Sequence, residues 1–394
     1  MKTRHLALLV ALFASALSLR PQVIGVGPLL PEIQDDLNIS HAAAGLLGTI
    51  PVLCMGLFAP PAARVLARFG SSSAITACLV LIAAFGIARS IVPPAVLVIL
   101  LTFGVGIGMG LLGAMLPIAV KERFSARPAF ATGMYALGIN VGAGASAATA
   151  VPIADATFGW RGSLFVFSAV TGLLAVIWLV MSRGNVSARP SVARKPTPLP
   201  WRSGFAWLFA SIFLLMAVMY YGINAWLPET YVERGWTAER AAWLVAVLNL
   251  TTLPCTIAFS WLADKLGSRR LWLVGGTSIA STSVLGIVLW SDGAFLWAAM
   301  FGVSAGVMFP LIMTLPLDVA DDPGMVGAVA GMTLGVGYSL GSLSPLVLGA
   351  IRDVSGSFQA AMWVIAGVTI AAGVLCSTLT RERLDRGLRS YGVT

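Results

Sequence analysis

The chain has 394 residues, of which 58% are hydrophobic and 10% are charged, and its mean hydropathy is +0.90. Soluble domains carry about 25% Asp, Glu, Lys and Arg, so this composition excludes an ordinary soluble protein and predicts an integral membrane protein. The net charge of +9 predicts no nucleic-acid partner, because the basic residues lie in short segments between apolar stretches, where they set membrane topology.

Apolar stretches recur along the whole chain, each long enough to cross a hydrocarbon core of about 30 Å. The N-terminal Lys2, Arg4 and His5 before Leu6 are typical of a signal peptide, but the apolar pattern runs on to Leu30, which favours a retained first span. We expect an all-α protein with about 12 transmembrane helices. The expected spans are 6–31, 41–63, 71–90, 94–119, 128–152, 160–182, 204–228, 238–262, 271–290, 293–316, 324–350 and 358–380.

A linker at 183–203 contains four prolines and five basic residues, a composition that forms no core. It predicts an N-terminal six-helix bundle at 1–182 and a C-terminal one at 204–394 with a short cytoplasmic tail. Similar elements recur in both halves: Phe103-Gly104-Val105 at Phe301-Gly302-Val303, Gly133-Met134 at Gly331-Met332, and Pro31-Glu32 at Pro228-Glu229. Two such halves are typical of transporters that rock about a central site.

The distribution of Lys and Arg predicts the orientation. With the N-terminus inside, the inside segments carry 19 of these residues and the outside segments carry five. The outside residues are Arg89, Arg161, Arg234, Arg240 and Arg352. This bias places both termini in the cytoplasm and the chain in the cytoplasmic (inner) membrane. Asp318, Asp321 and Asp322 form an exception, an inside acidic loop with no basic partner.

Arg20 lies 14 residues past Leu6, about 21 Å along a helix, and so near the middle of the first span. Pro21 cannot donate to the carbonyl of Leu17, which predicts a kink there. All 16 acidic residues lie toward span ends or in loops, so the charge at mid-depth is positive and no embedded carboxylate is seen as a proton carrier. A buried cation beside a kink favours an anion site. The alternative is an arginine satisfied by carbonyls or amides.

Further polar side chains lie in the spans that would surround a central cavity. Tyr221 and Asn224, three residues apart, share a helix face, as do Tyr220 and Asn224. We predict that these residues help Arg20 to bind a small anionic or polar substrate, although each residue alone is more often an interhelical hydrogen bond than a ligand. The predicted substrate ligands are Arg20, Gln22, Tyr135, Asn140, Tyr220, Tyr221, Asn224 and Tyr338.

No feature of the sequence indicates catalysis. The four cysteines, Cys54, Cys78, Cys255 and Cys376, lie within spans without a CxxC pair, and the two histidines are far apart, so we expect no metal site, disulfide or cofactor. A membrane enzyme would need a nucleophile–base pair or paired acids at depth. A channel would need charged rings or filter loops. We therefore favour a monomeric transporter in the lipid bilayer over an enzyme, a channel or a receptor.

The segment Trp261–Arg270 resembles a signature of the major facilitator superfamily, approximately G-x-x-x-D-x-x-G-R-R, found between the second and third helices of each half. Asp264, Gly267, Arg269 and Arg270 fit this pattern, whereas Ser260 or Trp261 replaces its first glycine. We expect Asp264 to accept hydrogen bonds from an arginine or a helix N-terminus and to hold the outward-open state. The alternative is a charged turn that marks topology. The first half has Ala67 in place of the acid.

Other residues resemble the cyanate/nitroimidazole permease family of that superfamily. They are Leu19-Arg20-Pro21, Gly27–Ile33 with Ser40, Trp226-Leu227-Pro228 and Gly337-Tyr338. The resemblance implies a secondary active transporter that moves a small solute, such as a cyanate-like anion, a nitro-compound or a small organic acid, by rocker-switch alternating access. A multidrug or toxic-compound exporter is the second hypothesis. Exporters of cationic drugs commonly carry membrane acids, which are absent from these spans.

Overall fold

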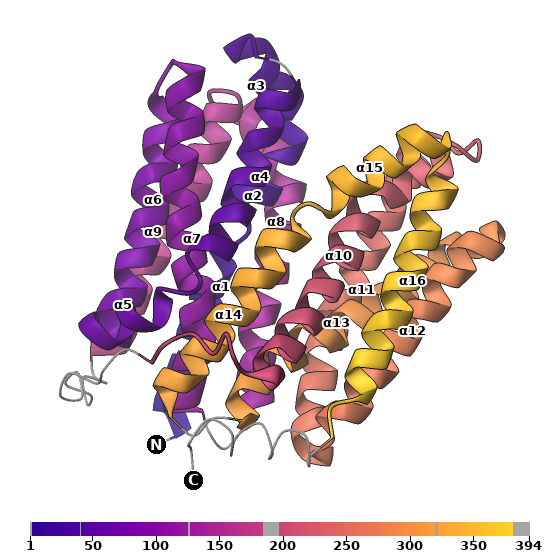
Figure 1. The fold of residues 1–394 in the computed structure, drawn as a ribbon. Coiled ribbons are helices and arrows are strands. Elements are labelled where there is room, and N and C mark those ends of the chain that lie inside the picture. The colour runs from indigo at the N-terminus through magenta and orange to yellow at the C-terminus, as the bar shows by residue number, and fades with distance from the viewer. Residues whose placement is uncertain (1, 40, 125–126, 184–196, 320–321, 381–394) are drawn as a thin grey trace. The chain divides into compact units, whose positions relative to one another are not determined.

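The computed structural model describes residues 2–39, 41–124, 127–183, 197–319 and 322–380. These residues form helices and contain no strand (Figure 1). Eleven helical segments are long and apolar enough to cross a membrane, and a bent helix pair makes a possible twelfth. In lipid a helix satisfies its own backbone hydrogen bonds, so apolar runs of this length fold as helices. The all-α membrane fold with about 12 spans is confirmed.

The chain forms two compact units. The first contains Met1–Ser125, Met134–Leu199 and Asp322–Gly331, and the second contains Ala126–Gly133, Pro200–Asp321 and Met332–Thr394. Two long helices, α8 and α14, therefore begin in one unit and continue into the other. The boundaries 1–182, 183–203 and 204–394 stay a prediction, and most of the linker lies outside the described residues.

The first half of the chain contains nine α-helices and a short 3-10 helix among its described residues. They are α1 (Lys2–Leu17), α2 (Pro21–Ile24), η1 (Gly27–Leu29), α3 (Leu30–Leu37), α4 (His41–Leu57), α5 (Ala62–Phe69), α6 (Ser71–Ile91), α7 (Ala95–Arg123), α8 (Pro128–Ala156) and α9 (Trp160–Arg183). The core of the first unit includes Ile33, Leu47, Trp160 and Leu164, all buried.

The second half contains seven α-helices and a short 3-10 helix among its described residues. They are α10 (Gly204–Val232), α11 (Ala238–Leu266), α12 (Arg269–Leu289), η2 (Ser291–Gly293), α13 (Ala294–Val319), α14 (Pro323–Gly341), α15 (Ser344–Ser355) and α16 (Phe358–Ser377). Phe209, Phe213 and Ile223 of α10 are wholly buried in the second unit.

Besides the first span, described below, two of the expected spans are bent or broken. The span expected at 41–63 contains α4 and the start of α5, and these two helices meet at an angle of 68°. Pro60 and Pro61 lie between them and have no N–H groups to donate to a continuing helix. The span expected at 324–350 is interrupted between Gly341 and Ser344, where α14 gives way to α15.

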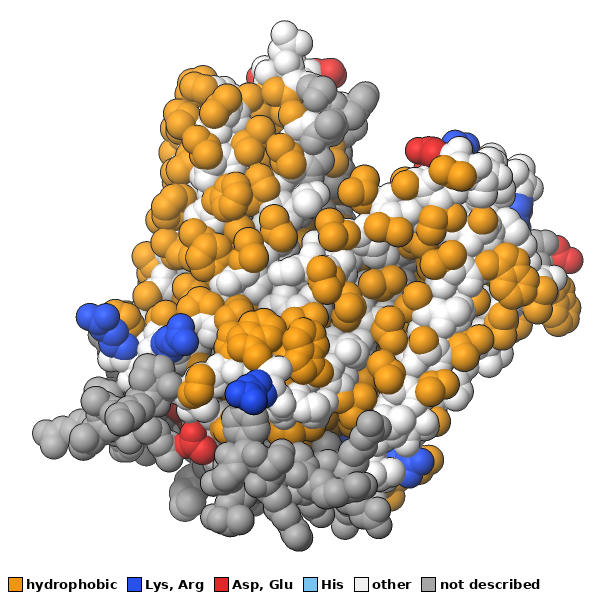
Figure 2. Space-filling model, viewed as in Figure 1, with side chains coloured by type: hydrophobic (Ala, Val, Ile, Leu, Met, Phe, Trp, Pro, Cys, Tyr) orange, Lys and Arg blue, Asp and Glu red, His pale blue; other side chains and the backbone are white. Residues whose placement is uncertain are grey.

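Apolar side chains cover the sides of the helices in each unit, while charged side chains are concentrated near the helix ends (Figure 2). On α9, Leu173, Val176 and Val180 are each more than half exposed. Exposed apolar side chains of this number are unfavourable in water and match a surface that faces lipid.

Candidate functional site

The first span is broken at Arg20. Helix α1 ends at Leu17 and α2 begins at Pro21, with Arg20 as the N-cap residue of α2. Since Pro21 has no N–H, the helix cannot continue through it unchanged, and the N–H groups of Val23 and Ile24 donate to the carbonyl of Arg20 at 3.0 and 2.9 Å. Arg20 is 9% exposed. The structure thus places a buried cation at a helix break.

Glycines on α8 cover the end of α1. A Cβ atom at Gly138 would collide with the carbonyl of Phe13, and one at Gly142 would collide with the carbonyl of Leu17, which Pro21 leaves without its usual donor. Small residues allow such close approach of helix backbones. In the second unit, Gly337 and the end of α14 lie equally close to α10. These contacts fix α8 against the broken helix that carries Arg20.

Gln22 and Arg89 form a buried network next to the break. The guanidinium of Arg89 donates to the backbone carbonyl of Gln22 at 3.0 Å, to its side-chain Oε1 at 2.7 Å, and to Thr102 Oγ1 at 3.3 Å. The amide of Gln22 donates to Ser168 Oγ at 3.0 Å. Arg89 is 0% exposed. The residue that the sequence assigned to an outside segment is thus buried among helices, and among the described residues Arg20 is not the sole buried cation.

The other predicted ligands of the first half lie on α8, where Tyr135 is buried and Asn140 is half-buried. Among the residues whose burial the structure describes, the buried charged side chains are Arg20 and Arg89, and neither Asp nor Glu is among them. The first unit thus provides two cations and no carboxylate at buried positions.

The second unit brings three amide and hydroxyl side chains together. Tyr220 Oη donates to Asn249 Oδ1 at 3.3 Å, and Asn249 Nδ2 donates to Asn224 Oδ1 at 3.2 Å. The rings of Tyr220 and Tyr221 lie 5.7 Å apart. Asn249 was missed in the sequence, where its spacing on α11 carries no signal of its own. The ring of Tyr338 on α14 meets the ring of Phe213 edge-on, with the ring centroids 5.1 Å apart.

The charged turn after α11 is tightly hydrogen-bonded in the second unit. The backbone N–H groups of Ala129 and Phe130, at the start of α8, donate to the Asp264 carboxylate at 3.1 and 2.6 Å. Arg269 donates to Asp264 at 3.0 Å and to Asp318 at 3.0 Å. Asp318 therefore has a basic partner, contrary to the sequence expectation.

The two other residues of this motif have simpler surroundings. Gly267 ends α11 with a φ of 73°, a left-handed conformation that favours glycine, and Arg270 is exposed. Ser260, one of two candidates for the missing first glycine of the motif, is wholly buried, and a Cβ atom at Gly133 would lie 2.6 Å from its Cβ. A glycine on α8 thus makes room for a larger residue on α11.

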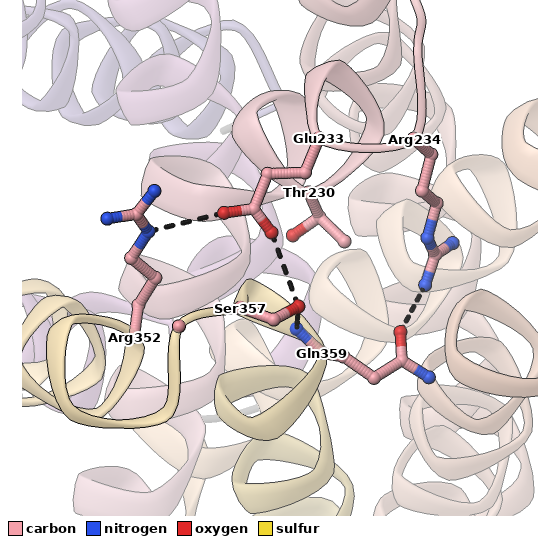
Figure 3. Close-up of a pocket in the computed structure, with 7 residues that line it drawn as sticks. Thr230, Glu233, Arg234, Arg352, Ser357 and Gln359 are labelled. Carbon is pink, nitrogen blue, oxygen red and sulfur yellow. Dashed lines mark hydrogen bonds and ion pairs between the residues drawn. The ribbon is translucent and has the colours of Figure 1, made fainter.

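A polar pocket of about 440 Å³ lies at the ends of α10, α15 and α16 (Figure 3). On one side Glu233 accepts from Arg352 Nε at 3.2 Å and from the backbone N–H of Phe358 at 2.9 Å. On the other side Arg234 donates to Gln359 Oε1 at 2.7 Å. The side chains lining this pocket are bonded mainly to one another, so they join the helix ends.

The first unit has a similar joint. Glu32 accepts from the backbone N–H of Trp160 at 3.0 Å, and Arg161 donates to Asp36 at 3.1 Å and to the carbonyl of Val92 at 2.7 Å. In both units an acid from the first long helical segment caps the last long helix. The sequence offset pairs Glu32 with Glu229, but the structure gives the capping role to Glu233, one turn later.

Comparison with known proteins identifies the family. A model of the Major Facilitator Superfamily matches residues 6–342. The 2-nitroimidazole transporter of Escherichia coli K12 is 28% identical over 381 residues, covering 96% of this chain and 97% of the relative. The cyanate transport protein CynX of the same organism is 27% identical over 357 residues, covering 89% and 91%.

A solved structure agrees with this family. The proton:xylose symporter XylE bound to 6-bromo-6-deoxy-D-glucose superposes with a TM-score of 0.79 at 13% identity, covering 98% of this chain and 99% of that chain. At this identity the likeness shows the fold alone, which is the fold expected from the family match. With the family model covering most of its length, the chain belongs to the Major Facilitator Superfamily and is a transporter rather than an enzyme.

Proposed function

We propose that this transporter carries a small monovalent anion, or a small polar solute with an electron-rich group, and that Arg20 binds it. The observation that carries the proposal is the burial of Arg20 at the break between α1 and α2, in a chain whose described buried residues include no carboxylate. A guanidinium in a site of low dielectric attracts an anion strongly and holds an oxyanion through two parallel hydrogen bonds. The cyanate and nitroimidazole transporters support a compact solute of this kind.

The supporting ligands belong to both halves of the chain. Asn140 and Tyr135 lie on α8, while Tyr220, Tyr221, Asn224 and Tyr338 lie on α10 and α14. We place Gln22 in the same site as the residue that holds the break, since its amide bonds to Arg89 and Ser168. Transport then follows by rocker-switch alternating access between the halves, in the cytoplasmic membrane with both termini inside.

The cytoplasmic gate of this mechanism is the Asp264 cluster. Asp264 accepts two backbone N–H groups from the positive end of α8 and pairs with Arg269. Breaking and remaking these bonds is the step that we assign to the change between outward-open and inward-open states. A multidrug exporter of cationic compounds is less well supported, because the buried charges of the described residues are positive.

Binding of small anions to the purified protein tests the proposal. Thermal unfolding is followed in detergent at increasing concentrations of sodium cyanate, sodium nitrite and sodium acetate, with neutral acetamide as the counterpart of acetate. We expect the anions, and not acetamide, to raise the melting temperature, because binding to the native state stabilises it.

Variants of Arg20 assign the effect to the site. Arg20→Lys keeps the charge but loses the planar fork and is expected to weaken binding about tenfold or more. Arg20→Ala is expected to abolish binding while the protein still folds, because the cost of burying a cation is removed with it. Arg68→Ala, which removes an exposed arginine on α5, is the matched control. Equal anion binding by wild type and Arg20→Ala would refute the proposal.

A further inference from the structure

We propose that Arg89 is a second determinant of anion binding. It hydrogen-bonds to Gln22 and so holds the helix break at Arg20 in position, and its own positive charge is balanced by the bound anion. This inference rests on the proposed function, since it concerns the same site. Arg89 lies on α6, on a different span from Arg20, and the sequence gives no reason to connect the two.

The first step of the argument is geometric. Arg89 holds Gln22 twice, by the backbone carbonyl at 3.0 Å and by Oε1 at 2.7 Å. Gln22 lies two residues past Arg20, in the four-residue helix α2. A helix this short has few internal hydrogen bonds, so its position depends on contacts with its neighbours. Arg89 therefore fixes the segment that presents Arg20.

The second step concerns charge. Arg89 is 0% exposed, and the acceptors that it has among the described residues are a carbonyl, an amide oxygen and a hydroxyl, all neutral. Its Nε donates to no described residue. A buried charge without a counter-ion is costly, and an anion that binds nearby reduces that cost. The positive charge of Arg89 thus favours an anionic ligand over a neutral one of the same shape.

The residues around Gln22 allow the close packing that its contact with Arg89 requires. Ser168 on α9 holds the amide of Gln22 from the other side at 3.0 Å. A Cβ atom at Gly86 would collide with the Ser168 side chain and lie 3.3 Å from Gln22 Oε1, and one at Gly25 would lie 2.6 Å from the ring of Phe167. Only residues without a side chain allow α6 and α9 to approach α2 this closely.

Two variants at Arg89 separate the charge from the shape of the side chain. Arg89→Gln removes the charge and keeps a hydrogen-bond donor, whereas Arg89→Lys keeps the charge and loses the fork. The apparent affinity for sodium cyanate and sodium nitrite is measured from the melting temperature. We expect Arg89→Gln to lose about tenfold or more in affinity for both anions, by the weakened Coulomb attraction, and Arg89→Lys to recover a clear part of that loss.

Gln22→Glu supplies a test that leaves Arg89 in place. A carboxylate at this position keeps the bond to the guanidinium but gives Arg89 a permanent counter-ion. We expect anion affinity to fall about tenfold while the melting temperature without anion is unchanged or higher. A purely structural role for Arg89 predicts equal losses in Arg89→Lys and Arg89→Gln. Arg68→Ala, which removes an exposed arginine on α5 far from this network in the chain, is the control and is expected to bind the anions like wild type.

The outcomes distinguish this inference from the proposed function. If Arg20→Ala abolishes anion binding while Arg89→Gln and Gln22→Glu bind like wild type, Arg89 has no role in binding and the inference is overturned. If Arg20→Ala binds like wild type, the proposed function itself fails, whatever the Arg89 variants do. If Arg89→Gln does not fold, the affinity of Gln22→Glu decides the question.

Discussion

Asn249 connects two side chains that contribute to the proposed site. It accepts from Tyr220 and donates to Asn224, and it also donates to the carbonyl of Val245 one turn earlier. Because each of these groups is half-buried, removal of the amide costs the Tyr220 hydroxyl and the Asn224 amide one hydrogen bond each. The network orients Tyr220 and Asn224 through a residue that need not touch substrate.

We predict that Asn249→Ala weakens binding of cyanate and nitrite about fivefold to tenfold, with a loss of about 1–3 kcal/mol in the stability of the folded state. The melting temperature with and without anion gives both values. Leu250→Ala, on the neighbouring exposed position, is the control and is expected to bind like wild type. Wild-type affinity in Asn249→Ala would exclude the network from the site.

The sequence identified Arg20 but neither Arg89 nor Asn249, and the reason is physical. A charged residue in the middle of an apolar span is unusual, and this can be recognised from the sequence alone, without knowing which residues surround it. Arg89 lies two residues before the last residue of its helix, where a side chain can equally well reach water or headgroups. Its burial depends on Gln22, 67 residues away in the chain. Such long-range pairing is not visible in local sequence.

At the level of helices, the N-termini of α9 and α16 are each capped by an acidic side chain. Glu32 and Glu233 each accept the first backbone N–H of the helix that they cap, which satisfies a donor that has no partner within the helix. At α9 the helix is preceded by Gly159, with a φ of 68°, and a side chain there would collide with the Glu32 carboxylate.

We predict that Glu32→Gln and Glu233→Gln each destabilise the protein by about 1 kcal/mol, in the range of a lost N-cap. The ion pair of Glu233 with Arg352 adds little, because Arg352 is 43% exposed. Glu229→Gln changes an exposed acid on the same helix and is the matched control. A drop in melting temperature for Glu229→Gln equal to that for Glu233→Gln would show that the capping bonds are unimportant.

The Asp264 cluster is the second element-level contact. We predict that Asp264→Asn shifts the balance between inward-open and outward-open states by about 1–3 kcal/mol, because a neutral amide binds the α8 N-terminus and Arg269 less strongly. Accessibility of single cysteines on each side of the membrane measures the shift. Glu122→Gln, also on the predicted inner side, is the control. Unchanged transport and labelling in Asp264→Asn would leave Asp264 as a topology marker.

Helix positions were predictable, but their breaks were only partly so. The kink at Pro21 followed from a proline within an apolar run. The bend between α4 and α5 has the same cause, at Pro60 and Pro61. It was not predicted, because the expected span ended at residue 63, so these prolines lay close to its end and indicated no bend. The Asp264 motif predicted the kind of partner that the acid has, whereas the choice of Ala129, Phe130 and Asp318 depends on tertiary packing.

For the molecule as a whole, the charge bias gives a topology that experiment can test. With the N-terminus inside, the inside segments carry 19 Lys and Arg residues and the outside segments carry five. We predict that reporter fusions at residues 190 and 394 report a cytoplasmic location and that fusions near residue 93 report the opposite side. A linker fusion outside the cytoplasm would contradict the proposed orientation.

The bond between Gln22 and Arg89 also bears on how the chain enters the bilayer during synthesis. The first span carries Arg20 and Gln22 and is costly to release into lipid alone, and α6 carries Arg89 with the same difficulty. Their mutual contact exists only after α6 has left the ribosome, some 67 residues later. We expect the first span to stay beside the insertion machinery until α6 arrives, so that these helices partition into lipid together.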